Sequence, residues 1–148
     1  DLDEEHLIAS YLLEGTRRHF SQDGMTADVL EIGEATRWQN SEETSLRDIR
    51  YQAQAESGAV WDIDAAAGIF YEDINELELK NGVTVLELTR DATMQTESMR
   101  LYMDQKRAQG EQEVVMTGRG SRTTGSAFEL DLQSSMATLK GDVRTEYE

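Results

Sequence analysis

The chain of 148 residues contains no cysteine and no proline. The absence of cysteine excludes disulfides, thiolate metal ligands and cysteine nucleophiles. Without proline, tight turns depend on Gly, Asn, Asp and Ser. The two histidines, His6 and His19, lie in no carboxylate–histidine metal motif. We therefore predict that the protein has no metal site and needs no cofactor.

Positive charge and long apolar runs are also scarce. The chain has 14 Lys and Arg against 30 Asp and Glu, which gives a formal net charge of −16. This charge argues against nucleic acid or a bare anionic membrane as a partner, although solubility alone would account for it. The longest nearly apolar run, residues 65–71, is far shorter than the roughly 20 residues of a spanning helix. We interpret residues 1–9 as a flexible lead-in, either of a processed protein or of the soluble piece of a longer one, and 10–148 as one domain.

Alternation of apolar and polar residues dominates the rest of the chain. In TTGSAFELDLQSSMATLKGDVRTEYE, residues 123–148, Phe128, Leu130 and Leu132 alternate with polar residues. Ala137, Leu139 and Val143 continue the pattern in a second run. A period of two predicts strands with one buried face. Because similar runs recur upstream and no strand pair buries its apolar face alone, we expect the pairs to stack on one another.

Turn signals separate these runs. Asp23-Gly24 predicts a tight hairpin after a strand over residues 10–20. The alternation slips near Ile32-Gly33, which predicts a bulge. Residues 108–110 and 118–120 are predicted as turns. The spacing of strands and turns favours a sandwich or an open barrel.

The segment 89–107 fits two interpretations. Met94, Met99 and Met103 would share one face of a helix, whereas Met99-x-Leu101-x-Met103 alternates as in a strand. Periodicity alone does not decide between them. We prefer the strand because the surrounding chain consists of strands.

We predict an all-β fold, an antiparallel β-jellyroll of two sheets with an apolar groove between them. From the pattern alone, an ordinary closed core is the better interpretation, and an apolar ligand held between splayed sheets is the functional one. The residues that we expect to face inward and to bind lipid are Ile49, Tyr51, Trp61, Ile63, Leu77, Leu79, Met99, Leu101, Met103, Phe128, Leu130, Ala137 and Leu139.

No motif indicates catalysis. The acidic residues are spread along polar faces and do not form an evident glycosidase pair. Gly118-x-Gly120 lacks the third glycine of a dinucleotide loop, and no serine lies in a Gly-x-Ser-x-Gly context. We therefore predict that the protein is not an enzyme and has no catalytic residue.

Four stretches stand out together by their order and spacing: Phe20 with Asp23-Gly24, Trp61-x-Ile63-x-Ala65, Leu77-x-Leu79 with Val83-x-Val85, and the terminal run from Val143 to Glu148. Through these stretches the chain resembles, from about Thr16 to Glu148, the LptC family of the lipopolysaccharide export machinery.

The resemblance implies a periplasmic β-jellyroll anchored in the Gram-negative inner membrane by an N-terminal helix that is absent from this chain. Members accept lipopolysaccharide from an inner-membrane ABC transporter at the N-terminal edge and pass it to LptA at the C-terminal edge, with the lipid chains between the sheets. The terminal strand is also a template for strand addition because its backbone groups are unpaired. We therefore assign partner binding to Arg144, Thr145, Glu146 and Tyr147. Whether the protein forms a homodimer is left open.

Two alternatives remain at this point. The first is an LptA-like soluble bridge protein with the same repeat. The second is a structural β-domain with a closed core and no lipid ligand.

Overall fold

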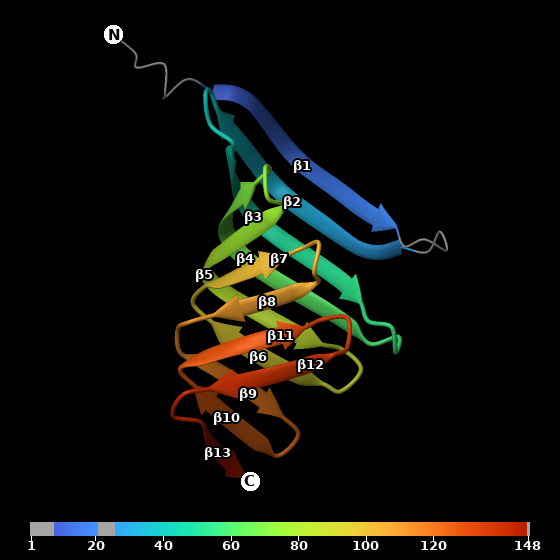
Figure 1. Ribbon diagram of the computed structural model, residues 1–148, viewed down its shortest axis with the longest axis vertical. Helices are drawn as coiled ribbons and strands as arrows, with labels where there is room; N and C mark the ends of the chain where they lie inside the picture. Colours follow the sequence, from blue (N-terminus) through green and yellow to red (C-terminus); the bar gives the residue numbers. More distant parts are fainter. Residues whose placement is uncertain (1–7, 21–25, 148) are drawn as a thin grey trace.

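The structure, a computed structural model, describes residues 8–20 and 26–147 (Figure 1). The described residues form strands and turns, and no described helix could cross a membrane. The lead-in residues 1–7 and the Asp23-Gly24 hairpin lie outside the described ranges. The strands are β1 (Ile8–Phe20), β2 (Thr26–Trp38), β3 (Glu43–Gln54), β4 (Val60–Tyr71), β5 (Glu76–Glu87), β6 (Ala92–Thr96), β7 (Met99–Tyr102), β8 (Arg107–Gly110), β9 (Val114–Gly118), β10 (Ser121–Gly125), β11 (Ala127–Asp131), β12 (Met136–Lys140) and β13 (Arg144–Tyr147).

All 13 strands belong to one antiparallel sheet that is folded over on itself. Strand β5 shows how: residues 76–79 pair with β7, whereas residues 83–87 pair with β6. We call the layer that continues through β7, β8, β11 and β12 the front half. The layer that continues through β6, β9, β10 and β13 is the back half. In Figure 1 these two sets of strands lie one in front of the other.

The long strands β1–β5, of 12 or 13 residues, cross from one half to the other. The shorter strands do the same in consecutive pairs: β6 with β7, β8 with β9, β10 with β11, and β12 with β13. In each pair one member hydrogen-bonds within the back half and the other within the front half. The protein is thus a meander of bent strands, each beside its sequence neighbours.

The strands change direction along one line, which we call the bend. Glu14 of β1 and Asp48 of β3 have φ angles of 55°, and Asn81 and Gly82 of β5 have φ angles of 64° and 96°. Asp142, between β12 and β13, has a φ of 47°. Asn and Asp tolerate this left-handed conformation better than most residues, so the sequence supplies them where the backbone must turn.

The bend also switches which side chains face inward. In β3, Leu46 is buried before the bend and Ile49 and Tyr51 after it, so the inward set changes from even to odd positions. The alternation of apolar and polar residues slips near Gly33 because β2 crosses the bend there and its inward-facing positions change. The predicted bulge is therefore wrong, because the pairing of β2 with β1 and β3 keeps one register on both sides of Gly33.

The all-β antiparallel prediction is confirmed, and its two sheets are the two halves of one folded sheet. The strand interpretation of residues 89–107 is also confirmed, as β6, β7 and the start of β8. Strand β1 begins at Ile8, earlier than predicted. Residues 108–110 are not a turn, because they pair with β7 and β11. Val143 is exposed, since the chain bends at Gly141 and Asp142 instead of continuing as one strand.

Candidate functional site

The interior between the two halves is the candidate site. All thirteen residues predicted to face inward lie in it: eleven are buried in the core, and Ala137 and Leu139 pack against it. Both halves contribute, for example Ile63 from the back half and Leu101 from the front half, each 0% exposed. The structure thus places these residues on one continuous apolar surface, while lipid binding by them stays a prediction.

This interior is filled by its own side chains. Where Arg17, Leu30 and Tyr51 of the back half meet Asn75 and Met103 of the front half, a cavity of about 30 Å³ remains. That volume suits a water molecule or two. In this conformation the apolar surface is a packed core, and a larger ligand would have to separate the halves.

A buried hydrogen bond lies inside the back half. The Tyr51 hydroxyl donates to Asp28 Oδ2 at 2.8 Å, and both residues are buried. Burial, with the Asp28 carboxylate nearby, raises the pKa of Tyr51 well above its usual value of 10.0. The neutral phenol is therefore the form that the fold stabilises.

Tyr51→Phe is expected to lower the free energy of unfolding at pH 7 by about 1.5–3 kcal/mol, the range for a hydrogen bond to a charged group. Because the folded pKa is raised, the stabilisation is complete below pH 10 and is lost as the pH rises above it. The difference between wild type and variant should therefore shrink between pH 10 and pH 11.5. Urea denaturation at these pH values measures it, and a constant difference would contradict the assignment.

The side of the molecule opposite the bend is closed by hairpin turns, and we call this side the seam. Three turns of the front half there, β4–β5, β7–β8 and β11–β12, end in a residue with positive φ: Asn75, Lys106 and Ser135. Bonds across the seam include Trp61 Nε1 to Ser135 Oγ at 3.0 Å and Glu56 N to Gln133 O at 3.2 Å. The two halves are thus joined by backbone at the bend and by hydrogen bonds at the seam.

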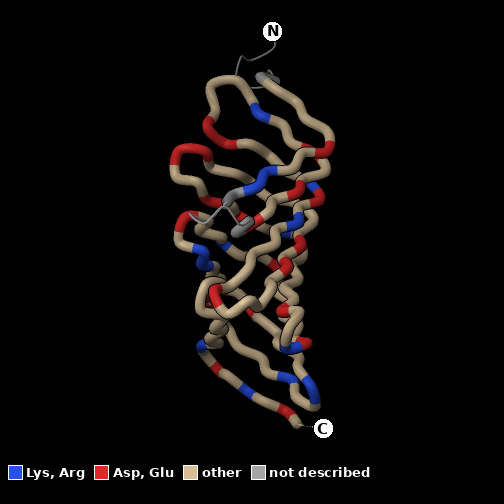
Figure 2. Tube along the Cα trace, turned by 90° about the vertical axis from the view of Figure 1, so that its right-hand side faces the viewer, with Lys and Arg blue, Asp and Glu red and all other residues tan. Residues whose placement is uncertain are grey.

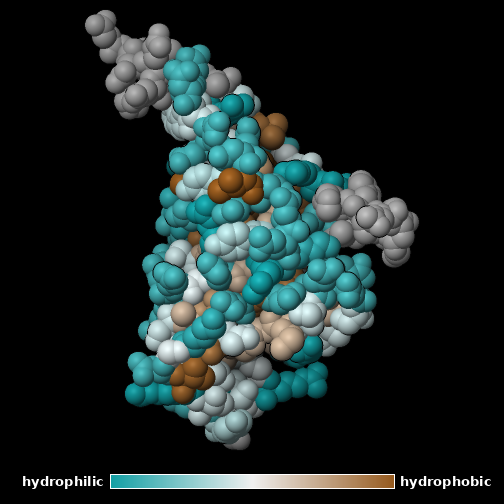
Figure 3. Space-filling model, in the orientation of Figure 1, coloured by the Kyte–Doolittle hydropathy of each residue, from teal (hydrophilic) through white to brown (hydrophobic). Residues whose placement is uncertain are grey.

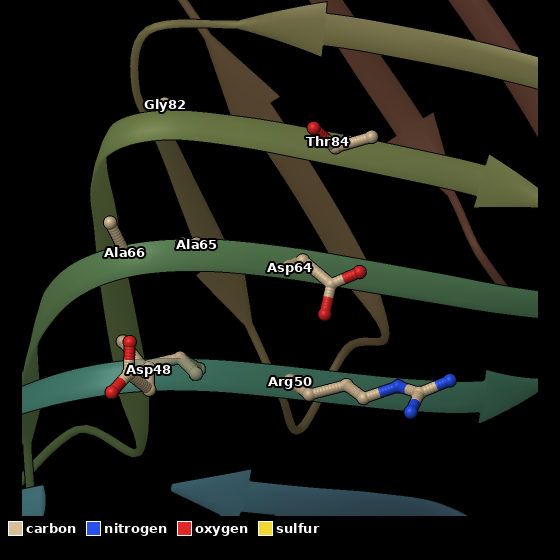
Figure 4. Close-up of a pocket in the computed structure, with 8 residues that line it drawn as sticks. Asp48, Arg50, Asp64, Ala65, Ala66, Gly82 and Thr84 are labelled. Carbon is tan, nitrogen blue, oxygen red and sulfur yellow. The ribbon is translucent and has the colours of Figure 1, made fainter. Parts of the chain in front are cut away.

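The outer face at the bend carries a shallow, open hollow of about 350 Å³ lined by Asp48, Arg50, Asp64, Ala66 and Thr84, among others (Figure 4). Arg50 donates to the buried carboxylate of Asp62 at 2.7 Å. Burial, and secondarily the Asp62 charge, raises the pKa of Asp64.

No group of three or more acidic or histidine side chains among the described residues is arranged to hold a metal ion. Lys and Arg are interspersed with Asp and Glu along the trace (Figure 2).

Among the described residues, each end of the meander has a strand edge that pairs with no other strand. β1 pairs with β2 on one side, and β12 and β13 end the front and back halves at the other end (Figure 1). The predicted partner-binding residues Arg144, Thr145, Glu146 and Tyr147 form β13, and all are exposed, Tyr147 by 81%. On the face shown in Figure 3, apolar side chains form separated spots on a polar surface. Strand β1 adds three consecutive exposed residues, Tyr11, Leu12 and Leu13.

Sequence reasoning missed the buried polar residues of the interior, the seam and the outer face. Asp28, Asp62, Glu87 and Ser135 are all buried and hydrogen-bonded. In the sequence they look like ordinary solvent-facing positions. Asp62 had one signal: it lies beside Trp61 in a run of apolar residues, where an acidic side chain needs a partner.

The fold and site define an open β-sandwich with an apolar interior and free strand edges at both ends. The family model described as "Lipopolysaccharide-assembly, LptC-related" matches residues 4–148, and the chain belongs to this family.

Comparison with other proteins adds a solved structure. It is "LptH, the LptA homologous periplasmic component of the conserved lipopolysaccharide transport device from Pseudomonas aeruginosa". The identity is 11%, the alignment covers 99% of this chain and 98% of that chain, and the TM-score is 0.37. No curated protein matches the sequence.

Proposed function

We propose that this protein is a non-enzymatic carrier of lipopolysaccharide on the periplasmic side of the Gram-negative inner membrane. It accepts the lipid from an inner-membrane ABC transporter and passes it to LptA. Membership of the LptC-related family supports the proposal. The observation that carries it is the continuous apolar surface that both halves turn toward each other.

The chemistry of the interior suits acyl chains. Each methylene removed from water contributes about 0.8 kcal/mol, so several chains need a long apolar surface. Met94, Met99 and Met103 are buried among the leucines and valines, and their flexible side chains adapt to a ligand of variable shape. The charged saccharide would stay outside, and no step requires a cofactor.

The free edges suit the transfer. Strand β1 at the N-terminal edge would face the transporter, and β12 with β13 at the C-terminal edge would receive LptA. An added strand pairs its backbone with the edge and continues the sheet. Because β12 and β13 end both halves, a bent strand docked there would prolong the front and back halves together. Tyr147 would add apolar contact at the junction.

Photo-crosslinking tests the proposed interior. A photoreactive residue at Leu79 or Leu101, both fully buried, is expected to label lipopolysaccharide. The same residue at Glu78 or Arg100, the outward neighbours that pair across β5 and β7, should label it at least tenfold less. Equal labelling from both faces would reject the interior as the lipid site.

The alternative is a structural domain with a closed core, which the filled interior favours. Titration of the purified chain with a fluorescent lipid A analogue separates the two functions. Saturable binding supports the carrier, and no binding supports the structural domain.

A further inference from the structure

Acyl chains do not fit the interior of the described residues as it stands. Ile63, Leu77 and Leu101 are fully buried, and the cavity between Tyr51 and Met103 holds only about 30 Å³. If the protein takes up lipid as proposed above, its two halves must separate first. The inference that follows rests on that proposed function.

Separation at the bend is unfavourable because the backbone crosses it in every bent strand. The ladders β4·β5 and β3·β4 also continue close to the bend on either side, for example at Ala65↔Val83 and Ile49↔Ala65. In the part of the chain that the structure describes, no strand ladder crosses the seam. It is held by hydrogen bonds between hairpin turns, so the halves can part there while the bend acts as the hinge.

The strongest set of these hydrogen bonds involves one turn, residues 132–135 between β11 and β12. From the back half, Trp61 Nε1 donates to Ser135 Oγ at 3.0 Å, and Arg90 Nη2 donates to Ser135 O at 3.3 Å. Glu56 N donates to Gln133 O at 3.2 Å, and Gln133 Nε2 donates back to Glu56 Oε1 at 2.9 Å. One turn of the front half thus forms hydrogen bonds with three parts of the back half: the β3–β4 turn, strand β4 and the β5–β6 turn.

The turn is preorganised for these contacts. The Asp131 carboxylate accepts the N–H groups of Gln133 and Ser134, both at 3.1 Å. Ser135 is buried with a φ of 61°, which directs its hydroxyl and carbonyl to the back half. On the other side, Glu87 accepts the N–H groups of Thr89 and Arg90 and fixes the β5–β6 turn.

The seam near β1 is held less firmly. There Arg17 of the back half reaches Asn75 Oδ1 at 3.5 Å and lies 5.9 Å from the centre of the Phe70 ring. Both contacts are long, and the hydrogen bond is exposed to solvent. The contacts around residues 132–135 are shorter, at 2.9–3.3 Å, and the bond from Trp61 to Ser135 is buried, so they limit how far the seam opens.

We propose that the β11–β12 turn is a latch that holds the two halves together at the seam and must release before an acyl chain enters. While the latch is closed, it keeps water out of the interior. When it releases, contacts between side chains of the two halves are replaced by contacts with the acyl chains. Lipid uptake then depends on the seam, and Trp61 links the two because it belongs to the apolar interior and also donates to Ser135 of the latch.

A disulfide across the seam tests the latch. The natural chain has no cysteine, so Glu56→Cys with Gln133→Cys gives one pair at positions whose side chains already meet at 2.9 Å. The matched control, Glu129→Cys with Thr138→Cys, joins β11 to β12 within the front half. The probe is fluorescent lipopolysaccharide. Oxidation should weaken its binding at least tenfold in the seam pair and leave the control unchanged, with recovery on reduction.

Equal binding by the oxidised and reduced seam pair would overturn the latch while leaving the carrier function intact. Failure of the unmodified chain to bind would reject the proposed function instead. A measurement without lipid then decides on the latch: Arg90→Ala with Gln133→Ala should speed hydrogen exchange of the Trp61 indole N–H at least fivefold, with the Val85 amide unchanged. An unchanged indole rate shows that the turn does not hold the seam.

Discussion

Deletion of residues 144–148 is expected to abolish binding of LptA while the domain stays folded and still takes up lipopolysaccharide. Strand β13 contributes no buried side chain, so its loss removes little stability. It does remove the back-half part of the C-terminal edge. Strand β12 then projects beyond β10, and a bent partner strand no longer meets both halves at once. Calorimetric titration with LptA and thermal melts of both forms measure the two effects, and we expect affinity to fall at least 100-fold.

A side-chain variant provides the matched control. Arg144→Ala with Glu146→Ala changes the face of β13 that bears these two side chains and leaves the backbone edge in place. Because backbone pairing gives most of the affinity in strand addition, LptA binding should change less than threefold. If the truncated chain binds LptA as tightly as the full chain, the C-terminal edge is not the docking site.

Gly68→Val is expected to lower the free energy of unfolding by about 3 kcal/mol, as overpacking of a tight core does. A Cβ atom at position 68 would lie 2.7 Å from the Glu78 carbonyl oxygen and 2.7 Å from Ile49 Cδ1. The first of these is backbone of the neighbouring strand, which cannot rotate away. The melting temperature should fall by about 6–12 °C.

The control lies on the same strand. Ala66→Val adds the same kind of side chain at an exposed position just before the inward set changes, and its effect should stay within about 0.5 kcal/mol. Urea denaturation of both variants gives the comparison. Similar losses at positions 66 and 68 would mean that Gly68 does not mark the close approach of β4 and β5.

The inward-facing residues were predictable because alternation is a local property. Leu77 and Leu79, or Phe128 and Leu130, reveal their buried face within a few residues of sequence, and the structure confirms the orientation. Family resemblance added the proposed ligand and partners, which neither spacing nor composition contains. Those assignments remain predictions residue by residue.

The bend and the seam were not predictable in the same way. Glu14 and Asp48 take left-handed backbone angles because the sheet folds over there, and neither residue is an obvious turn former in its local context. The seam joins Trp61 to Ser135, which are 74 residues apart in the sequence. Contacts of that kind depend on the stacking of all the bent strands between them.

The meander has a consequence for size. Along the path β1-β2-β3-β4-β5-β6-β9-β10-β13, each strand touches its immediate neighbours, and neighbouring strands lie about 4.8 Å apart. An insertion of one more bent hairpin would therefore lengthen the molecule by about 10 Å without disturbing the contacts on either side. The length of such a molecule along the strand order therefore changes in steps of whole strands. Duplication of a segment can change this length in evolution without a redesign of the core.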